Sequence, residues 1–219
     1  MHFINVFIRG LVAMAIALSL SACSGQNALH HAANKGDLEK VKELIAEGAP
    51  LDALDGLGST PLNLAVRSGH KEVAQFLIEQ GADVNIRDQT GNTILHTAAQ
   101  MLRPEIAVLL IDNGAHVDEV ESIWKRTPLH FVSQLGPPEV AQYLINKGAD
   151  VNARDSLGNT PLHYAALSDR VRIAHMLLEK GADPYIPGQD PFTRTPGTTP
   201  LMLAHKKGMQ DLFKQFGAE

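Results

Sequence analysis

The apolar residues of this chain recur at the spacing of helices that bury one face. Ala74, Leu77 and Ile78 follow Val73 by one, four and five positions. This is the apolar stripe of an α-helix that packs on one side. The same stripe returns in residues 140–145, so the pattern predicts short amphipathic helices of repeated design.

A block of the Thr-Pro-Leu-His type starts each repeated segment. Successive blocks are separated by 33, 33, 34, 33 and 39 residues. Thr followed by Pro suits a helix start, because the hydroxyl accepts a hydrogen bond from a free backbone N–H and Pro lacks an N–H where none is needed. We therefore expect a helix after each block, and the blocks begin at Asn27, Thr60, Thr93, Thr127, Thr160 and Thr199.

Glycines recur where each helix is expected to end. Gly69 and Gly136 can end the first helix of their segments in the left-handed conformation. A Gly-Ala pair closes the second helix, and a polar link such as residues 88–91 or 155–158 then predicts a projecting turn. The Gly-Ala pairs begin at Gly48, Gly81, Gly114, Gly148 and Gly181.

With these motifs, residues 27–219 resemble ankyrin repeats. The resemblance implies an all-α fold, an ankyrin-repeat solenoid of about six stacked helix pairs with short β-hairpin or turn fingers. One such repeat cannot bury its apolar face alone, so neighbours must share a continuous core. The first repeat lacks its finger, and residues 209–216 are expected to cap the last. The repeats are expected at about 27–54, 55–87, 88–120, 121–154, 155–187 and 188–219.

Several positions depart from the repeat without breaking the pattern. Asn63 replaces the histidine of its block, and Leu102 and Asp169 occupy positions where the family has glycine. The finger containing residues 121–126 is one residue longer than its neighbours, and the finger over residues 186–197 is six residues longer. Both changes are insertions in fingers, and loops accept insertions at little cost.

The chain begins with the pattern of a secretory signal. The basic residue Arg9 precedes an apolar run over residues 11–20. This run is too short to span a bilayer, which needs about 20 apolar residues, but it fits the apolar core of a signal peptide. We expect residues 1–22 to be removed.

Leu20-Ser21-Ala22-Cys23 resembles the lipobox of bacterial lipoproteins. In that family the cysteine receives a diacylglyceryl group and becomes the first mature residue. The resemblance implies lipidation of Cys23, with residues 23–26 as a short tether to a membrane. The alternative is ordinary cleavage near Ala22, which leaves Cys23 as a free thiol.

Composition argues against one class of partner and indicates which residues build the core. The formal net charge is −5 and no block of Lys or Arg is present, which argues against a nucleic-acid partner. Aromatic residues make up only 5% of the chain, so the core must be built from Leu, Ile, Val and Ala. Since Cys23 is the only cysteine, the fold must hold by packing and without disulfides.

The histidines do not indicate a metal site. His96, His130 and His163 occupy one position of successive repeats, which helix packing separates by about 8–10 Å. A shared zinc needs each nitrogen at about 2.0–2.1 Å. In the ankyrin family this histidine hydrogen-bonds backbone between repeats, and the pair His30-His31 lacks further ligands at a suitable spacing.

Catalytic motifs are also missing from the sequence. It contains no G-x-S-x-G, no G-x-x-x-x-G-K and no H-E-x-x-H, and its acids are scattered. We expect no catalytic residue, no cofactor and no metal. The chain is interpreted as a binding protein, and an enzyme or metal carrier is disfavoured for lack of clustered titratable residues.

The resemblance places partner contacts on the fingers and on the exposed ends of the first helices. Large apolar side chains there favour an interface, and Trp124 is the foremost anchor. The alternative is that Ile123 and Trp124 pack locally. The long finger with Phe192 and Arg194 is a second candidate, with a drifted surface loop as its alternative. The expected partner-binding residues are Leu57, Arg67, Met101, Ile123, Trp124, Arg126, Leu157, Phe192 and Arg194.

Two functions follow from these patterns. The first is a monomeric, lipid-anchored lipoprotein of a bacterial envelope that acts as a scaffold or inhibitor of a protein partner. Ser24, rather than Asp, follows Cys23 and resembles outer-membrane sorting, which places the protein on the periplasmic face. A variant of this function is a periplasmic immunity protein. The second is a secreted, unanchored protein directed at a host.

Overall fold

Threonine precedes the first helix of four helix pairs. The computed structural model describes residues 28–218. The Thr60 hydroxyl accepts a hydrogen bond from the Asn63 N–H at 3.1 Å, and Pro at the first helical position sacrifices no hydrogen bond. The predicted Thr-Pro helix start is confirmed. These first helices are α3 (Pro61–Ser68), α5 (Ile94–Gln100), α7 (Pro128–Leu135) and α9 (Pro161–Leu167).

The second helices bury the predicted apolar stripes. Val140, Ala141, Leu144 and Ile145 of α8 (Pro138–Asn146) are all buried. The glycine that follows five of the second helices has a φ of 83–96°, the left-handed region that ends a helix. The remaining second helices are α2 (Leu38–Ala46), α4 (Lys71–Glu79), α6 (Pro104–Asp112), α10 (Val171–Glu179) and α11 (Lys207–Gln215).

The chain divides into two units, Met1–Asp83 (unit 1) and Val84–Glu219 (unit 2). In unit 1, residues 28–35 are helical and are followed by α2, α3 and α4. The Ser68 hydroxyl donates to the Asn34 side chain at 2.9 Å and so connects α3 to this first helix. No helix among residues 28–218 is long and apolar enough to cross a membrane.

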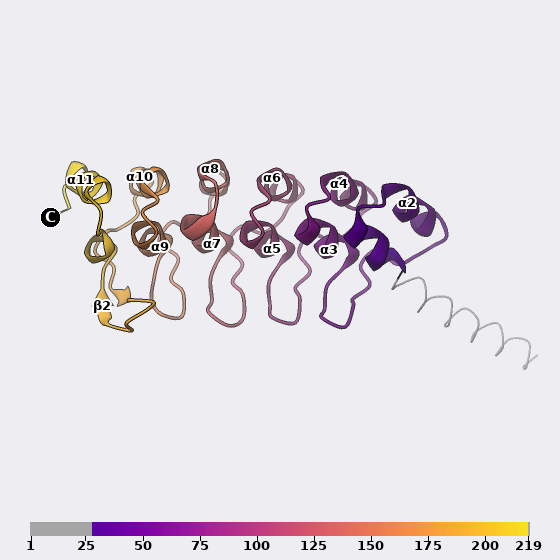
Figure 1. Cartoon of the computed structure of the whole chain (residues 1–219), viewed down its shortest axis with the longest axis horizontal. Helices are drawn as coiled ribbons and strands as arrows, with labels where there is room; N and C mark the ends of the chain where they lie inside the picture. Colours follow the sequence, from indigo (N-terminus) through magenta and orange to yellow (C-terminus); the bar gives the residue numbers. More distant parts are fainter. Residues whose placement is uncertain (1–27, 219) are drawn as a thin grey trace, which may run out of the picture. The chain divides into compact units, whose positions relative to one another are not determined.

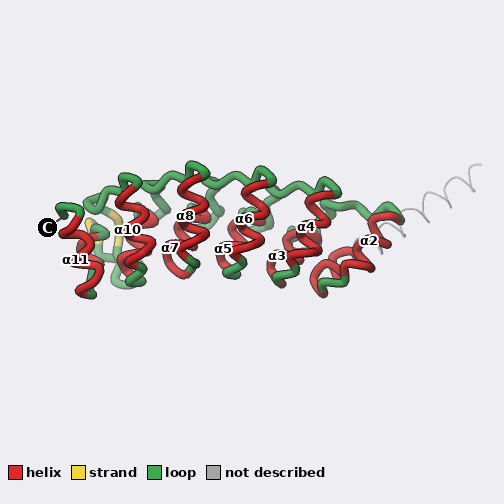
Figure 2. Tube along the Cα trace, turned by 90° about the horizontal axis from the view of Figure 1, so that it is seen from above, coloured by secondary structure: helices red, strands yellow, loops and turns green. Residues whose placement is uncertain are grey.

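Unit 2 is built from two rows of helices. Figure 1 shows α5, α7 and α9 in one row and α6, α8 and α10 in another, with the fingers projecting from the first row away from the second. Figure 2 shows the same pairs from above. Neighbours in each row contact one another: α5 with α7, α7 with α9, α6 with α8, and α8 with α10. The all-α architecture of helix pairs is confirmed.

The end of the chain departs from the repeat. The long finger forms an antiparallel hairpin of β1 (Gly188–Gln189) and β2 (Pro196–Thr198). After it, the expected first helix is reduced to the 3₁₀ turn η1 (Leu201–Leu203). The reason is length, because α11 begins seven residues after the block proline at 200, whereas α10 begins ten residues after Pro161. Helix α11 packs on α10 and supplies the expected cap.

Two glycines expected to end first helices behave differently. Gly69 is left-handed, with φ 82° and ψ 22°, as predicted. The prediction for Gly136 is wrong, because its φ is −77° and its ψ is 169°. Pro137 follows it, and a residue before proline is restricted to extended conformations. A Cβ at Gly136 would also lie 2.8 Å from the Cα of Val132.

Leu102 and Asp169 keep the left-handed conformation despite their side chains. Their φ values are 55° and 54°, in a region where a Cβ is crowded by the following carbonyl. The repeat therefore dictates the backbone at these two positions even without glycine.

Asparagine side chains that follow two of the Gly-Ala pairs connect neighbouring repeats. In unit 2 the Asn85 side chain accepts from the His116 N–H at 3.0 Å and donates to the Gly114 carbonyl at 3.1 Å. Asn152 makes the same pair of bonds one repeat later, to Asp183 and Gly181. The asparagine three positions after each of these two Gly-Ala pairs thus connects its repeat to the loop of the following one.

Candidate functional site

Three of the fingers are tight turns closed by an aspartate. In each, the carboxylate accepts hydrogen bonds from the backbone N–H groups two and four residues ahead; Asp155, for example, accepts from Leu157 and Asn159 at 2.8 and 2.9 Å. The aspartate N–H also donates to the carbonyl four residues ahead. We call these the narrow turns, residues 55–59, 88–92 and 155–159, and each contains a glycine with a φ of 76–77°.

Two fingers contain one more residue per turn. The Glu121 N–H donates to the Arg126 carbonyl at 3.1 Å, and the Asp190 N–H donates to the Thr195 carbonyl at 3.0 Å. Both turns close five residues ahead instead of four. We call residues 121–126 and 190–195 the wide turns.

The wide turns place cations where the narrow turns have glycine. Lys125 and Arg194 have φ values of 57° and 59°, in the left-handed region that favours glycine. The extra residue noted in the sequence at 121–126 therefore changes both the size of the turn and the chemistry of its tip.

The fingers of unit 2 are connected in a row by hydrogen bonds. The Ser122 N–H donates to the Thr90 carbonyl at 3.1 Å, and the Ser156 N–H donates to the Trp124 carbonyl at 2.7 Å. The Gln189 N–H donates to the Asn159 side chain at 3.0 Å. Each finger thus positions the next one.

The predicted partner-binding residues lie on both units and differ in exposure. Leu57 and Arg67 lie in unit 1 and the other seven in unit 2. Of the apolar ones, Phe192 is the most exposed, at 79%, while Trp124 retains 39%. Leu57, Met101, Ile123 and Arg194 are also exposed, and Arg67, Arg126 and Leu157 are half-buried.

The structure brings three of these residues together around one ring. The guanidinium carbon of Arg126 lies 5.8 Å from the centroid of the Trp124 ring, and that of Arg194 lies 5.4 Å from it. Both distances are in the range of cation–π contacts. The two finger candidates of the sequence, around Trp124 and around Arg194, therefore form one surface, whereas Met101 lies apart at the C-terminal end of α5.

Arg126 also contacts three side chains that were not predicted as site residues. Its guanidinium carbon lies 4.7 Å from the Tyr164 ring centroid and 5.8 Å from that of Phe131. Its Nε lies 3.7 Å from the buried Asp155 carboxylate. The sequence does contain a signal for this support: an aromatic residue, Phe131 or Tyr164, directly follows the block histidine in two successive repeats.

A short hydrogen bond fixes the base of this cluster. The Tyr164 hydroxyl donates to Asp155 Oδ2 at 2.5 Å, and both side chains are buried. Burial, and then this hydrogen bond, raise the pKa of Tyr164. The phenol therefore remains a donor, and Asp155 remains available to Arg126.

The block histidines are structural, as the resemblance implies. Nε2 of His96, His130 and His163 lies 3.0–3.1 Å from a backbone carbonyl of the following repeat. Burial lowers the pKa of each to about 4. Among residues 28–218, no three His, Cys, Asp or Glu side chains are grouped so as to hold a metal.

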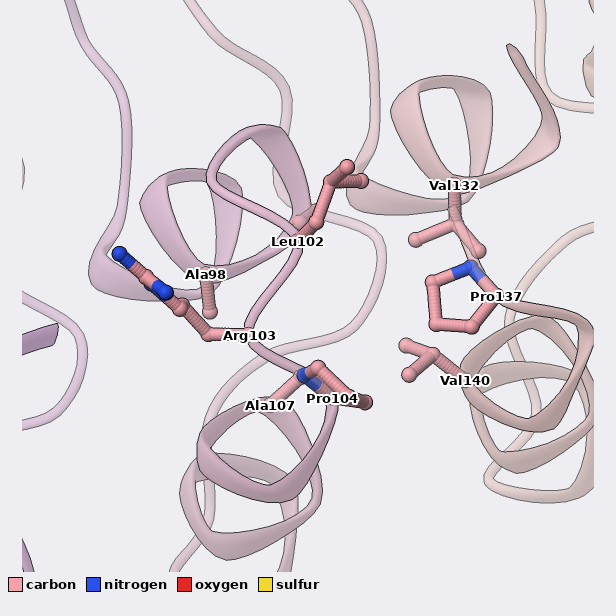
Figure 3. A pocket seen from close by; sticks show the side chains of 9 residues that line it. Ala98, Leu102, Arg103, Pro104, Ala107, Val132, Pro137 and Val140 are labelled. Atoms are coloured by element: carbon pink, nitrogen blue, oxygen red, sulfur yellow. The ribbon is translucent and has the colours of Figure 1, made fainter. Parts of the chain in front are cut away.

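Two hollows of unit 2 lie between neighbouring repeats. The one drawn in Figure 3 lies where Leu102, Pro104, Val132, Pro137 and Val140 meet, and it has no space for a water-sized molecule. A second hollow of about 180 Å³ lies beside Pro138 and Asp169. None of the nine predicted partner-binding residues lines either hollow.

Comparison with known proteins agrees with this geometry. A family model described as ankyrin repeats (3 copies) matches residues 8–88, 29–121 and 116–188, which together span most of the chain. No curated protein matches. Cys23 and the expected signal segment lie outside the described residues, so lipidation stays a prediction.

Proposed function

Because the chain belongs to the ankyrin-repeat family of protein–protein interaction modules, we propose that it is a non-catalytic, monomeric protein that binds its partner on the fingers of unit 2. The observation that carries this proposal is the meeting of Arg126 and Arg194 on the half-exposed ring of Trp124. Tryptophan and arginine are the residue types enriched at the centres of protein interfaces.

The proposed location is a bacterial envelope, with the protein held to the outer membrane through a lipid on Cys23. The sequence Leu20-Ser21-Ala22-Cys23 and the apolar run before it support this location. Only residues 24–27 separate Cys23 from the first described helix, which limits the reach of the binding surface from the membrane. A scaffold or an inhibitor would both be served by such a tether.

Affinity capture from an envelope extract tests the binding site. Trp124→Ala is compared with wild type and with Leu135→Ala, which removes an apolar side chain that is 60% exposed at the end of α7. We expect one specific band to be lost with Trp124→Ala and retained with Leu135→Ala, at unchanged helical circular dichroism. The same bands with all three proteins would contradict a site at Trp124.

A further inference from the structure

Lys125 and Arg194, the cations at the left-handed positions of the wide turns, form no ion pair within the described residues. From their placement we infer that the wide turns dock an acidic segment of the partner protein, an inference that rests on the proposed function and specifies its chemistry. The docking surface, called here the wide-turn surface, consists of Ile123, Trp124, Lys125, Arg126, Phe192 and Arg194.

The positive charge of this surface is available to a ligand. Within residues 28–218, neither Lys125 nor Arg194 forms an ion pair. Arg87, which precedes a narrow turn, pairs with Glu119 and donates to the Gly91 carbonyl at 2.9 Å. Arg154, which precedes another narrow turn, donates to the Pro187 carbonyl at 2.8 Å. Lys125 and Arg194 are therefore available to a partner.

The acids of the same turns are directed to the backbone. Glu121 is only 4% exposed, and its carboxylate accepts from the N–H groups of Ile123, Trp124 and Arg126 at 2.6–3.1 Å. Asp190 accepts from two N–H groups of its own turn, which lowers its pKa. Each carboxylate closes its turn from within while the cation occupies the tip.

Backbone strain distinguishes these tips from the narrow turns. A left-handed conformation costs free energy at Lys125 and Arg194 that the glycines of the narrow turns avoid. Strained positions of this kind cluster at ligand-binding sites, and Lys125 and Arg194 are the two that lie on finger turns, whereas Leu102 and Asp169 lie at the ends of first helices. Charge and strain thus point to the same two residues.

The chemistry of the surface selects the kind of segment. A guanidinium stacked on an aromatic ring keeps its edge N–H groups for bidentate bonding to carboxylates. Ile123 and Phe192 are 63% and 79% exposed beside these cations. A segment in which carboxylates alternate with apolar side chains matches both features. The positive charge of this surface is local, because the whole chain has a formal net charge of −5.

Trp124, the only tryptophan of the chain, reports binding directly through its fluorescence. The mature protein is titrated with a short synthetic peptide of alternating Glu and Leu, and with its counterpart that has Gln in place of Glu. We expect a saturable change in emission with the Glu peptide alone, weakened by salt. Arg194→Gln should weaken binding roughly tenfold, the order expected from losing a close interfacial charge pair.

Two further variants control the interpretation. Arg172→Gln makes the same charge change on α10, where Arg172 pairs with Glu139, and should leave the peptide affinity unchanged. Lys125→Gly removes one cation together with its strain, so it should raise the unfolding midpoint and still weaken binding. Because this variant is expected to be more stable, its loss of affinity cannot be attributed to misfolding.

Several outcomes would overturn the inference. They are an equal response to the Gln peptide, an equal effect of Arg172→Gln and Arg194→Gln, or Arg194-dependent binding to phosphatidylglycerol vesicles without peptide binding, which would assign the surface to anionic lipid. If the captured band still depends on Trp124 while the Glu peptide fails to bind, the proposed function survives and only the acidic partner is excluded.

Discussion

Nε2 of His130 lies 3.1 Å from the carbonyl oxygen of Asn159, at the base of the following finger. On the other side of the ring, the Thr127 N–H donates to His130 Nδ1 at 3.1 Å. A backbone N–H can only donate and a carbonyl can only accept, so the ring is neutral with its proton on Nε2. Protonation at Nδ1 would set two donors against each other.

We expect the free energy of unfolding to fall as the pH drops from about 6.5 to about 4. Burial lowers the folded-state pKa of His96, His130 and His163 to about 4 from the ordinary histidine value of 6.5. The unfolded chain therefore binds more protons in this window, and the stability present above pH 6.5 is progressively lost. Each histidine contributes on the order of 1–3 kcal/mol. Urea unfolding at about pH 7.5 and about pH 5 measures the loss.

The chain supplies a control for this prediction. Asn63 occupies the block position of histidine in its own repeat, where it is buried. His130→Asn should therefore be accommodated and should reduce the difference in stability between the two pH values. An unchanged pH dependence in this variant would show that the buried histidines are not its cause.

Tyr164→Phe should destabilise the protein by about 1–3 kcal/mol, because it removes a donor from a buried carboxylate. Tyr143→Phe is the matched control, since its hydroxyl donates to Asp112 at the surface. There the expected change is below about 1 kcal/mol. Thermal or urea unfolding of both variants measures the difference, and equal losses would contradict a special role for the buried pair.

Gly136→Ala should destabilise the protein by about 1–3 kcal/mol through overpacking. The new Cβ would lie 2.7 Å from a methyl group of Val132 and 2.8 Å from its Cα. Gly56→Ala is the control, because nothing lies within 4 Å of a Cβ at that position and its φ is not in the left-handed region. A loss of stability in Gly56→Ala as large as in Gly136→Ala would refute steric overlap as the cause.

Cys23→Ser should abolish lipid attachment if the lipobox resemblance holds. Metabolic labelling with a radioactive fatty acid, followed by membrane fractionation, measures the effect. Wild type is expected to carry label and to sediment with membranes, and the variant is expected to do neither. A wild-type mature protein that is soluble and unlabelled would favour the secreted alternative.

Local patterns predicted local structure well. The Thr-Pro starts, the apolar stripes and the closing glycines act within one or two turns of helix, so the nearby sequence decides them. Gly136 failed because a second local rule competed: the restriction imposed by Pro137 outweighs the tendency of glycine to end a helix. The shortening of the first helix of the last repeat to η1 was not predicted. It follows from the early start of α11, seven residues after the block proline at 200.

The candidate surface was only half predictable. Trp124 and Arg194 were each identified from their fingers, but their contact joins residues 70 positions apart, which no spacing rule gives. Lys125 was overlooked, although its position in the turn corresponds to glycine in the narrow turns. The support of Arg126 by Tyr164 and Asp155 depends on packing between repeats and became visible only in the structure.

The amide of Ser156 donates to the carbonyl of Trp124 and links two neighbouring fingers. A ligand that immobilises Trp124 must also restrain Ser156, which belongs to a different finger. Recognition at one tip should therefore spread along the row as a slowing of amide hydrogen exchange beyond the contact itself. The fingers would therefore respond together. Substitutions at fingers that do not contact the partner would still change the dissociation rate of the complex.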